Sequence, residues 1–464
     1  MTKEEKQYKT MTEGSTKKLV FTLGLPAMIS MLVTAIYNIA DTLFVAKIDT
    51  DGLASAAVTI IFPLMAIIQA IGFTFGMGSG SLISSKLGER KEDDAQRIGS
   101  SAFYISLFLG LLITVLCLLF LNPLLNLLGA TSKVLPYAKE YGIYIILGFP
   151  IMAGSFVMNN ILRSEGKAKF SMIGLTVGGI LNIILDPIFI YSLDMGIAGA
   201  AVATVVSQSV SFLILLSMFV FKKSIIKLSF NKIEKKFDTY FQIIKVGFPS
   251  LCRQGLASIA TILLNNMAVK YGDEQAQATM GIVSKIVMII FSMGLGIGQG
   301  YQPVCGYNYF AKKYDRVKEA MKFTFIFALS VMTFVSLICF IFSDTIIRWF
   351  NENEKIVEIG SKALKFQCAS MPFLSVNVVI NMTLQSTRKN FMATILSCCR
   401  QGLFYIPIVL LLPLAIGIDG VVLTQPIADV CTCIFSIPFY FIFFKILKKN
   451  EEELQIEINR LRNA

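Results

Sequence analysis

The feature that most constrains this chain is the number and length of its apolar runs. A helix that crosses a bilayer needs about 20 mostly apolar residues. Runs of that length lie at 19–44, 55–85, 99–122, 137–162, 170–193, 197–221, 240–268, 278–307, 321–343, 360–384, 391–416 and 420–446. Only 16% of the 464 residues are charged, and the mean hydropathy is +0.68. We therefore predict an all-α polytopic membrane protein with twelve transmembrane helices.

Basic residues are concentrated on one side of the predicted spans. Twelve spans place both termini on the same side, which carries 31 Lys and Arg against 8 on the other. Because cytoplasmic loops are enriched in Lys and Arg, both termini are predicted to be cytoplasmic, in a multi-pass protein of the cell (inner or plasma) membrane. Anionic lipid accounts for the net charge of +12, so nucleic-acid binding is not expected. The polar first 18 residues do not resemble a cleavable signal peptide.

Four short motifs recur in the same order along the chain, with shifts between 220 and 223 residues. They are GLP at 24–26 and GFP at 247–249, glycines at 76, 78 and 80 and at 296, 298 and 300, GFP at 148–150 and SMP at 370–372, and GIAGAAVAT at 196–204 and GIDGVVLT at 417–424. An even number of spans in each repeat makes the repeats parallel. The sequence therefore predicts two six-helix repeats around a central cleft.

This repeat predicts the organisation of the chain. The parts are a cytoplasmic tail (1–18), an N-lobe of six spans (19–221), a cytoplasmic linker (222–239), a C-lobe of six spans (240–446) and a cytoplasmic tail (447–464), the last a short frayed helix or a membrane-surface helix. Two lobes around a cleft favour alternating access, whereas a channel would more naturally be an oligomer around a pore with a filter sequence. Since a Walker A sequence is absent, an ion gradient is the expected energy source.

The stretch from Leu175 to Tyr191 carries the most informative polar residues. Asn182 and Asp186 are four residues apart, so on a helix they share one face. Pro187 leaves the carbonyl of Ile183 without its helical partner and predicts a kink. An ionisable residue within a membrane is costly to bury and marks a functional site by default.

Further polar residues in the same half point to a cation site. Asp41 lies in the first span, and Tyr37 is four residues before it, so its hydroxyl is expected to reach the carboxylate. Thr204 lies in the sixth span. Two carboxylates in a medium of low dielectric constant cannot both stay ionised without a proton or a bound cation. The ligands are all oxygens, which suits Na⁺ as well as H⁺; the alternative is that each Asp bonds only to nearby backbone.

The second half lacks these carboxylates. Leu264 occupies the repeat-equivalent position of Asp41, and Ile408 lies near that of Asp186. Asp429 is alone in the last span and is expected to pair with Arg400. Nothing resembles a nucleophile–base pair or a set of metal ligands, so the protein is not expected to be an enzyme or to carry a cofactor other than its coupling ion. Which Phe and Met residues contact the substrate stays open.

The motifs GLPAMISMLVTAIYNIADTLFV, GFTFGMGSGSLISSKLG (72–88) and LNIILDPIFI followed by GIAGAAVAT resemble the multidrug and toxic compound extrusion (MATE) family over residues 15–446. The resemblance implies export of amphipathic, usually cationic drugs in exchange for Na⁺ or H⁺. In the DinF-like branch the coupling ion sits in the N-terminal lobe. There, Asp41, Asn182, Asp186 and Thr204 fall on the cation site, and Tyr37 and Asn159 fall on its supporting hydrogen-bond network.

The NorM-like branch also uses acidic residues in the seventh, eighth or tenth span. This chain has Arg253, Gln254 and Asn377 in the seventh and tenth spans and no acid in any of the three. The expected function is secondary active multidrug efflux by a monomer, with amphipathic cations and membrane lipids as its partners. The alternatives are a lipid-linked oligosaccharide flippase of the same superfamily and a non-transporting membrane scaffold.

Overall fold

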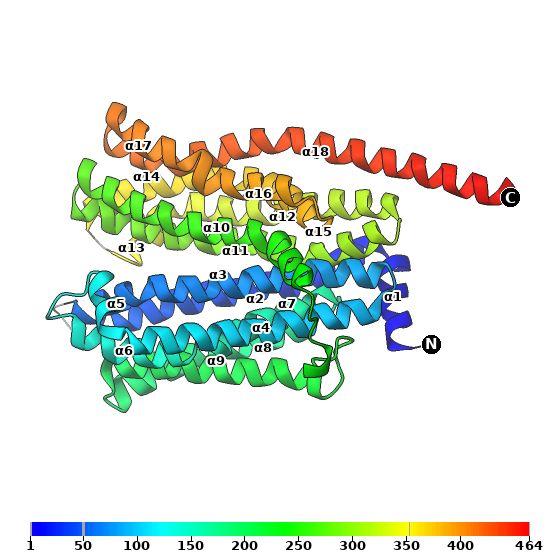
Figure 1. Cartoon of the computed structure of the whole chain (residues 1–464). Helices are drawn as coiled ribbons and strands as arrows, with labels where there is room; N and C mark the ends of the chain where they lie inside the picture. The colour runs from blue at the N-terminus through cyan, green and yellow to red at the C-terminus, as the bar shows by residue number, and fades with distance from the viewer. Residues whose placement is uncertain (1, 49–51, 352, 464) are drawn as a thin grey trace. The chain divides into compact units, whose positions relative to one another are not determined.

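The structure is a computed structural model that describes residues 2–48, 52–351 and 353–463. The described part is built from helices and contains no strand (Figure 1). The helices that begin in the first half of the chain are α1 (Lys3–Glu13), α2 (Thr16–Val45), α3 (Leu53–Gly88), α4 (Glu92–Leu119), α5 (Leu121–Leu127), α6 (Leu135–Leu147), α7 (Phe149–Ser164), α8 (Ala168–Pro187), η1 (Ile188–Ser192) and α9 (Gly196–Val220). The helices that follow are η2 (Phe230–Lys232), α10 (Phe237–Tyr271), α11 (Glu274–Phe310), α12 (Tyr314–Ile341), α13 (Ser343–Arg348), α14 (Glu354–Ser370), η3 (Met371–Phe373), α15 (Leu374–Ser386), α16 (Asn390–Cys398), η4 (Cys399–Leu403), α17 (Tyr405–Ile416) and α18 (Ile418–Asn463).

The expectation of an all-α polytopic membrane protein is confirmed. Within the described residues, ten helices are long and apolar enough to cross a membrane. The pair α6 and α7, bent by 45°, brings the number to eleven. The sequence predicted twelve; the remaining predicted span, 240–268, is the long helix α10, which is not among these eleven. Its interior carries Lys245 and Arg253, which lower its hydropathy.

Packing divides the chain into two compact units, and three helices (α2, α3 and α10) have residues in both. Unit 1 comprises residues 1–28, 84–90 and 252–464, and unit 2 comprises residues 29–83 and 91–251. The unit boundary thus falls near the end of α3, and it falls inside α2 and inside α10 at positions related by the repeat shift. The first helix of each repeat therefore begins in one unit and ends in the other, whereas the predicted lobes divide the chain at the linker.

Two glycine-rich stretches explain how these shared helices pack. In unit 1, a Cβ on Gly300 of α11 would lie 2.4 Å from the Cα of Gly24 in α2. In unit 2, a Cβ on Gly78 of α3 would lie 2.1 Å from the carbonyl oxygen of Ile243 in α10. Glycine lets helix backbones approach this closely. The repeated glycines thus seat the first helix of one repeat against the second helix of the other.

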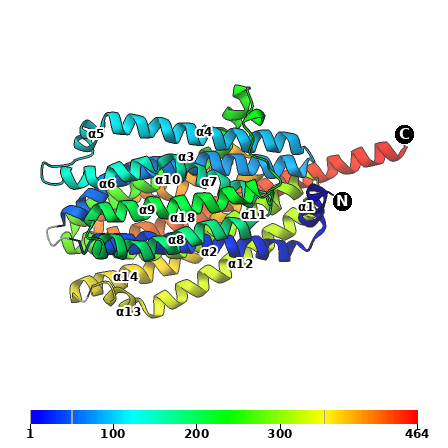
Figure 2. The same ribbon diagram turned by 90° about the horizontal axis from the view of Figure 1, so that it is seen from below.

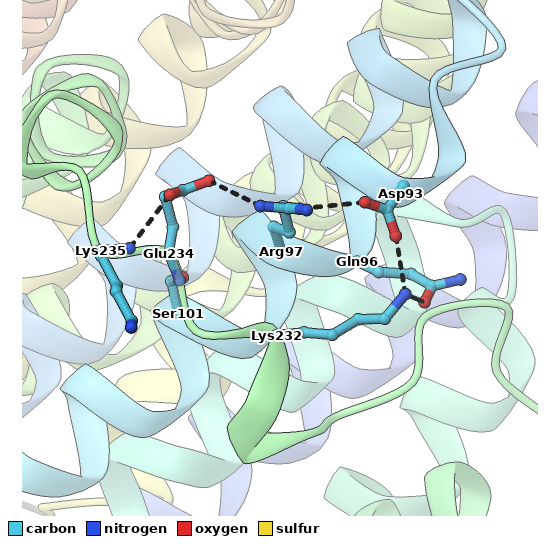
Figure 3. A network of polar contacts seen from close by, with 7 residues as sticks. All are labelled: Asp93, Gln96, Arg97, Ser101, Lys232, Glu234 and Lys235. Carbon is cyan, nitrogen blue, oxygen red and sulfur yellow. Dashed lines mark hydrogen bonds and ion pairs between the residues drawn. The ribbon is translucent and has the colours of Figure 1, made fainter.

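The segment between α9 and α10 is fixed to unit 2 by polar contacts (Figure 3). Lys232 Nζ lies 2.8 Å from Asp93 Oδ1 on the first turn of α4. Arg97 on the next turn pairs with Asp93 at 3.0 Å and with Glu234 at 3.5 Å. The backbone N–H of Glu234 donates to Ser101 Oγ at 2.8 Å. The predicted linker is therefore a strap held along the start of α4.

Glu165, which follows α7, holds the start of this strap. Its buried carboxylate accepts hydrogen bonds from the backbone N–H groups of Ile225 (2.7 Å) and Ile226 (3.1 Å) and from the hydroxyl of Ser224. Burial raises the pKa of Glu165, and the nearby Lys167 ammonium acts in the opposite direction. A charged side chain at this depth needs these donors, so the strap and the loop after α7 stabilise each other.

The terminal segments are helical and packed on unit 1. Helix α18 continues past residue 446, where the predicted tail begins, and reaches Asn463. Its extension pairs Glu451 with Lys318 at 2.6 Å and Glu457 with Lys312 at 2.9 Å. The C-terminal tail is thus the end of the last predicted span rather than a separate short helix.

Candidate cation-binding site

The polar centre of unit 2 begins with two residues of α8. Asn182 Nδ2 donates to Asp186 Oδ1 at 3.1 Å, which confirms that the two side chains share one face. Asp186 is completely buried and Asn182 is 3% exposed. Directly after Pro187 the α-helix gives way to the π-helical turn η1, so the expected disturbance takes the form of a wider turn. Such turns are frequent at functional sites.

Helix α9 adds Thr204 to this centre. Asn182 Nδ2 also donates to Thr204 Oγ1 at 3.3 Å. The two helices run side by side in both views (Figures 1 and 2). They pack closely because a Cβ on Gly178 of α8 would lie 2.8 Å from Ser211 of α9. The side-chain nitrogen of Asn182 therefore donates to a carboxylate and to a hydroxyl, whereas its side-chain oxygen has no donor among the described residues.

The part of α2 that belongs to unit 2 brings Asp41 and Tyr37 to the same centre. Asp41 is close enough to Asp186 for the two side chains to interact electrostatically. Both are also close enough to interact electrostatically with the buried hydroxyl of Tyr141 in α6. A Cβ on Gly179 of α8 would lie 2.6 Å from Val33 and 3.1 Å from the ring of Tyr37. The absence of a side chain at Gly179 thus allows α2 to approach α8 beside the carboxylates.

Tyr37 does not make the hydrogen bond that the sequence predicted. Its hydroxyl accepts from Gln208 Nε2 at 3.4 Å, and no bond to Asp41 joins the described side chains. Gln208 lies one turn after Thr204 on α9, so both face the same centre. The hydrogen bond of Tyr37 is thus made with an amide of a neighbouring helix, which donates to the hydroxyl, and not with the carboxylate one turn along α2.

Three buried oxygen atoms of this centre have no hydrogen-bond donor among the described residues. They are Asp41 Oδ1, Asn182 Oδ1 and Asp186 Oδ2. All three are acceptors, and an unpaired buried acceptor costs about 1–3 kcal/mol. Only a proton, a cation or a donating molecule such as water could satisfy them. These oxygens therefore form a candidate site for a proton or an oxygen-binding cation.

Asn159 is bonded elsewhere. Its side-chain nitrogen donates to Ser171 Oγ at 2.6 Å, about 16 Å along α8 from Asn182. The second repeat contains the same joint, in which Asn381 Nδ2 donates to the carbonyl of Ala393 (2.8 Å) and to Ser397 Oγ (2.9 Å). Unit 1 thus has the same bond between helices, although it has no equivalent of Asp41 or Asp186. The geometry of Asn159 is therefore that of a residue that joins two helices. Its predicted place in the cation network stays a prediction.

Two residues of this centre were not predicted from the sequence. Gln208 could have been found from its spacing of four residues after Thr204. Tyr141 gave no local signal, because a tyrosine in an apolar run is commonly a packing residue. Its position beside the carboxylates depends on how α6 packs in unit 2.

The expected pair in unit 1 is present. Arg400 Nε lies 2.9 Å from Asp429 Oδ1. Asp429 also accepts from Gln425 Nε2 at 2.6 Å and from Ser370 Oγ at 3.4 Å. Both oxygens of this carboxylate therefore accept hydrogen bonds, one of them from a cation, whereas Asp41 and Asp186 each have an oxygen without a donor among the described residues.

The comparison with known families agrees with the internal repeat. The model of the MatE family matches residues 26–188 and again residues 249–411. The chain belongs to the MatE family. The two matches cover most of the chain and have the spacing of the internal repeat. Members of this family are transporters and not enzymes.

Individual MatE proteins resemble this chain over most of its length. The multidrug export protein MepA of Staphylococcus haemolyticus is 29% identical over 429 residues, which are 92% of this chain and 93% of that protein. A crystal structure of MATE in complex with MaL6 has a TM-score of 0.90 at 26% identity, covering 97% of this chain and 100% of the other. An outward-facing multidrug resistance MATE family transporter of the MOP superfamily also has a TM-score of 0.90 at 26% identity, covering 97% and 99%.

Proposed function

We propose that this protein is a secondary active multidrug efflux antiporter. It exports amphipathic, mostly cationic compounds in exchange for H⁺ or Na⁺ by alternating access. The observation that carries this proposal is the set of three buried acceptor oxygens on Asp41, Asn182 and Asp186 without a donor. Relatives of similar length that are named multidrug export proteins support the substrate class.

In this proposal each member of the site in unit 2 has a role. Asp41 and Asp186 provide the negative charge that attracts a coupling ion. Asn182 is oriented by its bonds to Asp186 and Thr204, so its carbonyl oxygen is available as a neutral ligand. A proton would bind one of the two carboxylates, whereas Na⁺ would be held by the oxygens together. In both cases the ion removes a charge that is costly to bury.

Coupling follows from competition between this ion and the exported compound. A cationic compound is attracted by the ionised site and is less attracted once H⁺ or Na⁺ neutralises it. By linkage, the compound must weaken ion binding by the same factor. Release of the compound on one side and of the ion on the other then gives exchange, provided that the two states of the protein differ in their affinity for each.

Transport by purified protein in liposomes tests this proposal. The liposomes contain a fluorescent cationic dye, and a proton gradient or a Na⁺ gradient is imposed alone. We expect one gradient to drive dye movement in the wild type and neither to do so in Asp186→Asn. Asp194→Asn is the matched control because it removes an exposed carboxylate only eight residues away.

The outcomes separate the alternatives. Dye movement that persists in Asp186→Asn at the wild-type rate would contradict the assigned role of Asp186. An absence of dye movement in the wild type under both gradients would contradict antiport of cationic compounds. Movement of a fluorescent lipid-linked oligosaccharide in the same liposomes would then favour the flippase alternative over the scaffold alternative.

A further inference from the structure

Unit 1 contains a buried guanidinium that is only partly used. Arg400 lies in the π-helical turn η4 and is 8% exposed. Its Nε donates to Asp429, and its guanidinium carbon lies 4.1 Å from the centre of the Phe291 ring. The guanidinium group carries five N–H donors. Neither terminal nitrogen has a hydrogen-bond acceptor among the described residues, so four of the donors remain available.

The partner carboxylate does not need these remaining donors. Asp429 Oδ1 already accepts from Arg400 Nε and from Gln425 Nε2, and Oδ2 accepts from Ser370. The pair is therefore neutral as a whole, yet one edge of the guanidinium still presents a planar pair of N–H groups. That edge matches the two oxygens of a carboxylate.

A second buried polar atom extends the same chain of hydrogen bonds. Gln401 Nε2 donates to Gln425 Oε1 at 3.3 Å, which connects Gln401 to Asp429 through Gln425. Gln401 Oε1 is buried and has no donor. A polar chain that leaves unused donors on Arg400 and an unused acceptor on Gln401 is complementary to a ligand with an anionic group and an N–H or O–H group.

One aromatic side chain contacts this polar chain, because the ring of Phe291 lies under the guanidinium of Arg400. Three more rings lie on the two elements that carry Arg400 and Asp429 or directly after them. The ring centre of Phe404, which follows η4, lies 5.6 Å from that of Phe435 on α18, and Phe435 lies 5.5 Å from Phe439. A ring stacked on the guanidinium favours a flat, aromatic ligand next to the polar groups.

We propose that Arg400 is the centre of an anion subsite in unit 1 that binds the carboxylate of zwitterionic aromatic substrates. The inference rests on the proposed export function and specifies a substrate class for it. A zwitterion suits the subsite better than a simple anion, because it brings its own cation and leaves no net charge in the membrane. A cationic compound without a carboxylate gains nothing from Arg400.

Two dyes that differ in one group test the subsite. Rhodamine 110 has a free carboxylate, and rhodamine 123 is its methyl ester. Binding to the purified full-length protein is measured by fluorescence anisotropy, and export is measured in liposomes. The test variant is the double substitution Arg400→Gln with Asp429→Asn, because Arg400→Gln alone leaves a buried carboxylate unpaired.

We expect the double variant to bind rhodamine 110 about tenfold more weakly, the size of a lost hydrogen bond to a charged group. Its affinity for rhodamine 123 should stay within about twofold of the wild type. Arg400→Lys keeps the charge but not the planar pair of donors. Its affinity for rhodamine 110 should therefore lie between those of the wild type and the double variant. Arg348→Gln, which removes an exposed guanidinium of the same unit, should change neither affinity.

Three results would overturn the subsite. They are an equal loss of both dyes in the double variant, unchanged binding of rhodamine 110, and no binding of rhodamine 110 to the wild type. An equal loss would mean that Arg400 and Asp429 only hold the helices together. Failure of the proposed antiport is distinguishable, because it would abolish gradient-driven export of both dyes while the difference in binding remained.

Discussion

The two units of the molecule differ in the hydrogen-bond partners of their buried carboxylates. In unit 2, Asp41 and Asp186 lie near each other, and each has a buried oxygen without a donor. In unit 1, both oxygens of Asp429 accept hydrogen bonds, and the cation that neutralises it is Arg400 of the same chain. In the proposed function, unit 2 therefore takes up a positive charge from outside, whereas unit 1 contains its own in Arg400.

The two centres lie at equivalent positions of the internal repeat. The shift of 221 residues that relates 196–204 to 417–424 places Gln425 and Asp429 at the positions of Thr204 and Gln208. Both centres also lie beside a π-helical turn, η1 in unit 2 and η4 in unit 1. The two repeats thus place different side chains at equivalent helical positions. If the proposed function is correct, these side chains decide whether the positive charge at each centre is exchanged or permanent.

Removal of single carboxylates gives the largest expected difference between the units. Asp186→Asn and Asp41→Asn should each abolish gradient-driven dye export, because the coupling ion loses its charge partner. Asp429→Asn should retain most of the export of a cationic dye, because its carboxylate is already neutralised. Initial export rates in liposomes check this. A loss in Asp429→Asn as complete as that in Asp186→Asn would move the coupling site to unit 1.

Breaking the internal pair should affect stability more than transport. Arg400→Gln leaves Asp429 buried without its cation and should destabilise the protein by about 3–5 kcal/mol. Adding Asp429→Asn should restore most of that loss, since it removes the unpaired charge. Thermal unfolding in detergent measures both variants. If the double variant is as unstable as Arg400→Gln alone, the charge of Asp429 is not the cause of the instability.

The sequence predicted those parts of both centres that depend on one helix or on the repeat. Asn182 and Asp186 are four residues apart, so their contact follows from helical geometry, and the Arg400–Asp429 pair follows from the scarcity of charge in the spans. The sequence did not predict that Gln208, from a neighbouring helix, donates a hydrogen bond to the hydroxyl of Tyr37. It also gave no sign that α2 and α10 are shared between the units. These features depend on close helix packing at Gly179, Gly300 and Gly78, which hydropathy does not encode.

Asn159 offers an intermediate test, because the resemblance and the geometry assign it different roles. Asn159→Ala removes the bond to Ser171 and should destabilise the protein by about 1–3 kcal/mol. Asn381→Ala is its matched control in unit 1, since it removes the repeat-equivalent joint. Both should leave the ion dependence of dye export unchanged. A change in the half-saturating ion concentration in Asn159→Ala alone would place Asn159 in the cation network.

The smallest expected effect concerns Glu165 and is a dependence of stability on pH. Burial raises the pKa of Glu165 in the folded protein. Folding therefore favours the protonated carboxyl, so the contribution of Glu165 to stability is fully present at low pH and falls as the pH rises through the folded pKa. Glu165→Gln does not titrate. The difference in unfolding temperature between wild type and Glu165→Gln should thus decrease by a few degrees as the pH rises above 4.5, the ordinary pKa of a glutamate.

Glu234→Gln is the control for this measurement, because its side chain also holds the strap but lies nearer the surface. It should show little change in its difference from the wild type over the same pH range. The opposite result is that the difference in unfolding temperature between wild type and Glu165→Gln increases with pH. It would mean that the N–H donors of Ile225 and Ile226 and the Lys167 ammonium lower the pKa of Glu165 by more than burial raises it. The strap would then be held most firmly by the ionised carboxylate. In either case both oxygens of Glu165 accept hydrogen bonds from its own chain, whereas Asp41 and Asp186 each have one buried oxygen without a donor among the described residues.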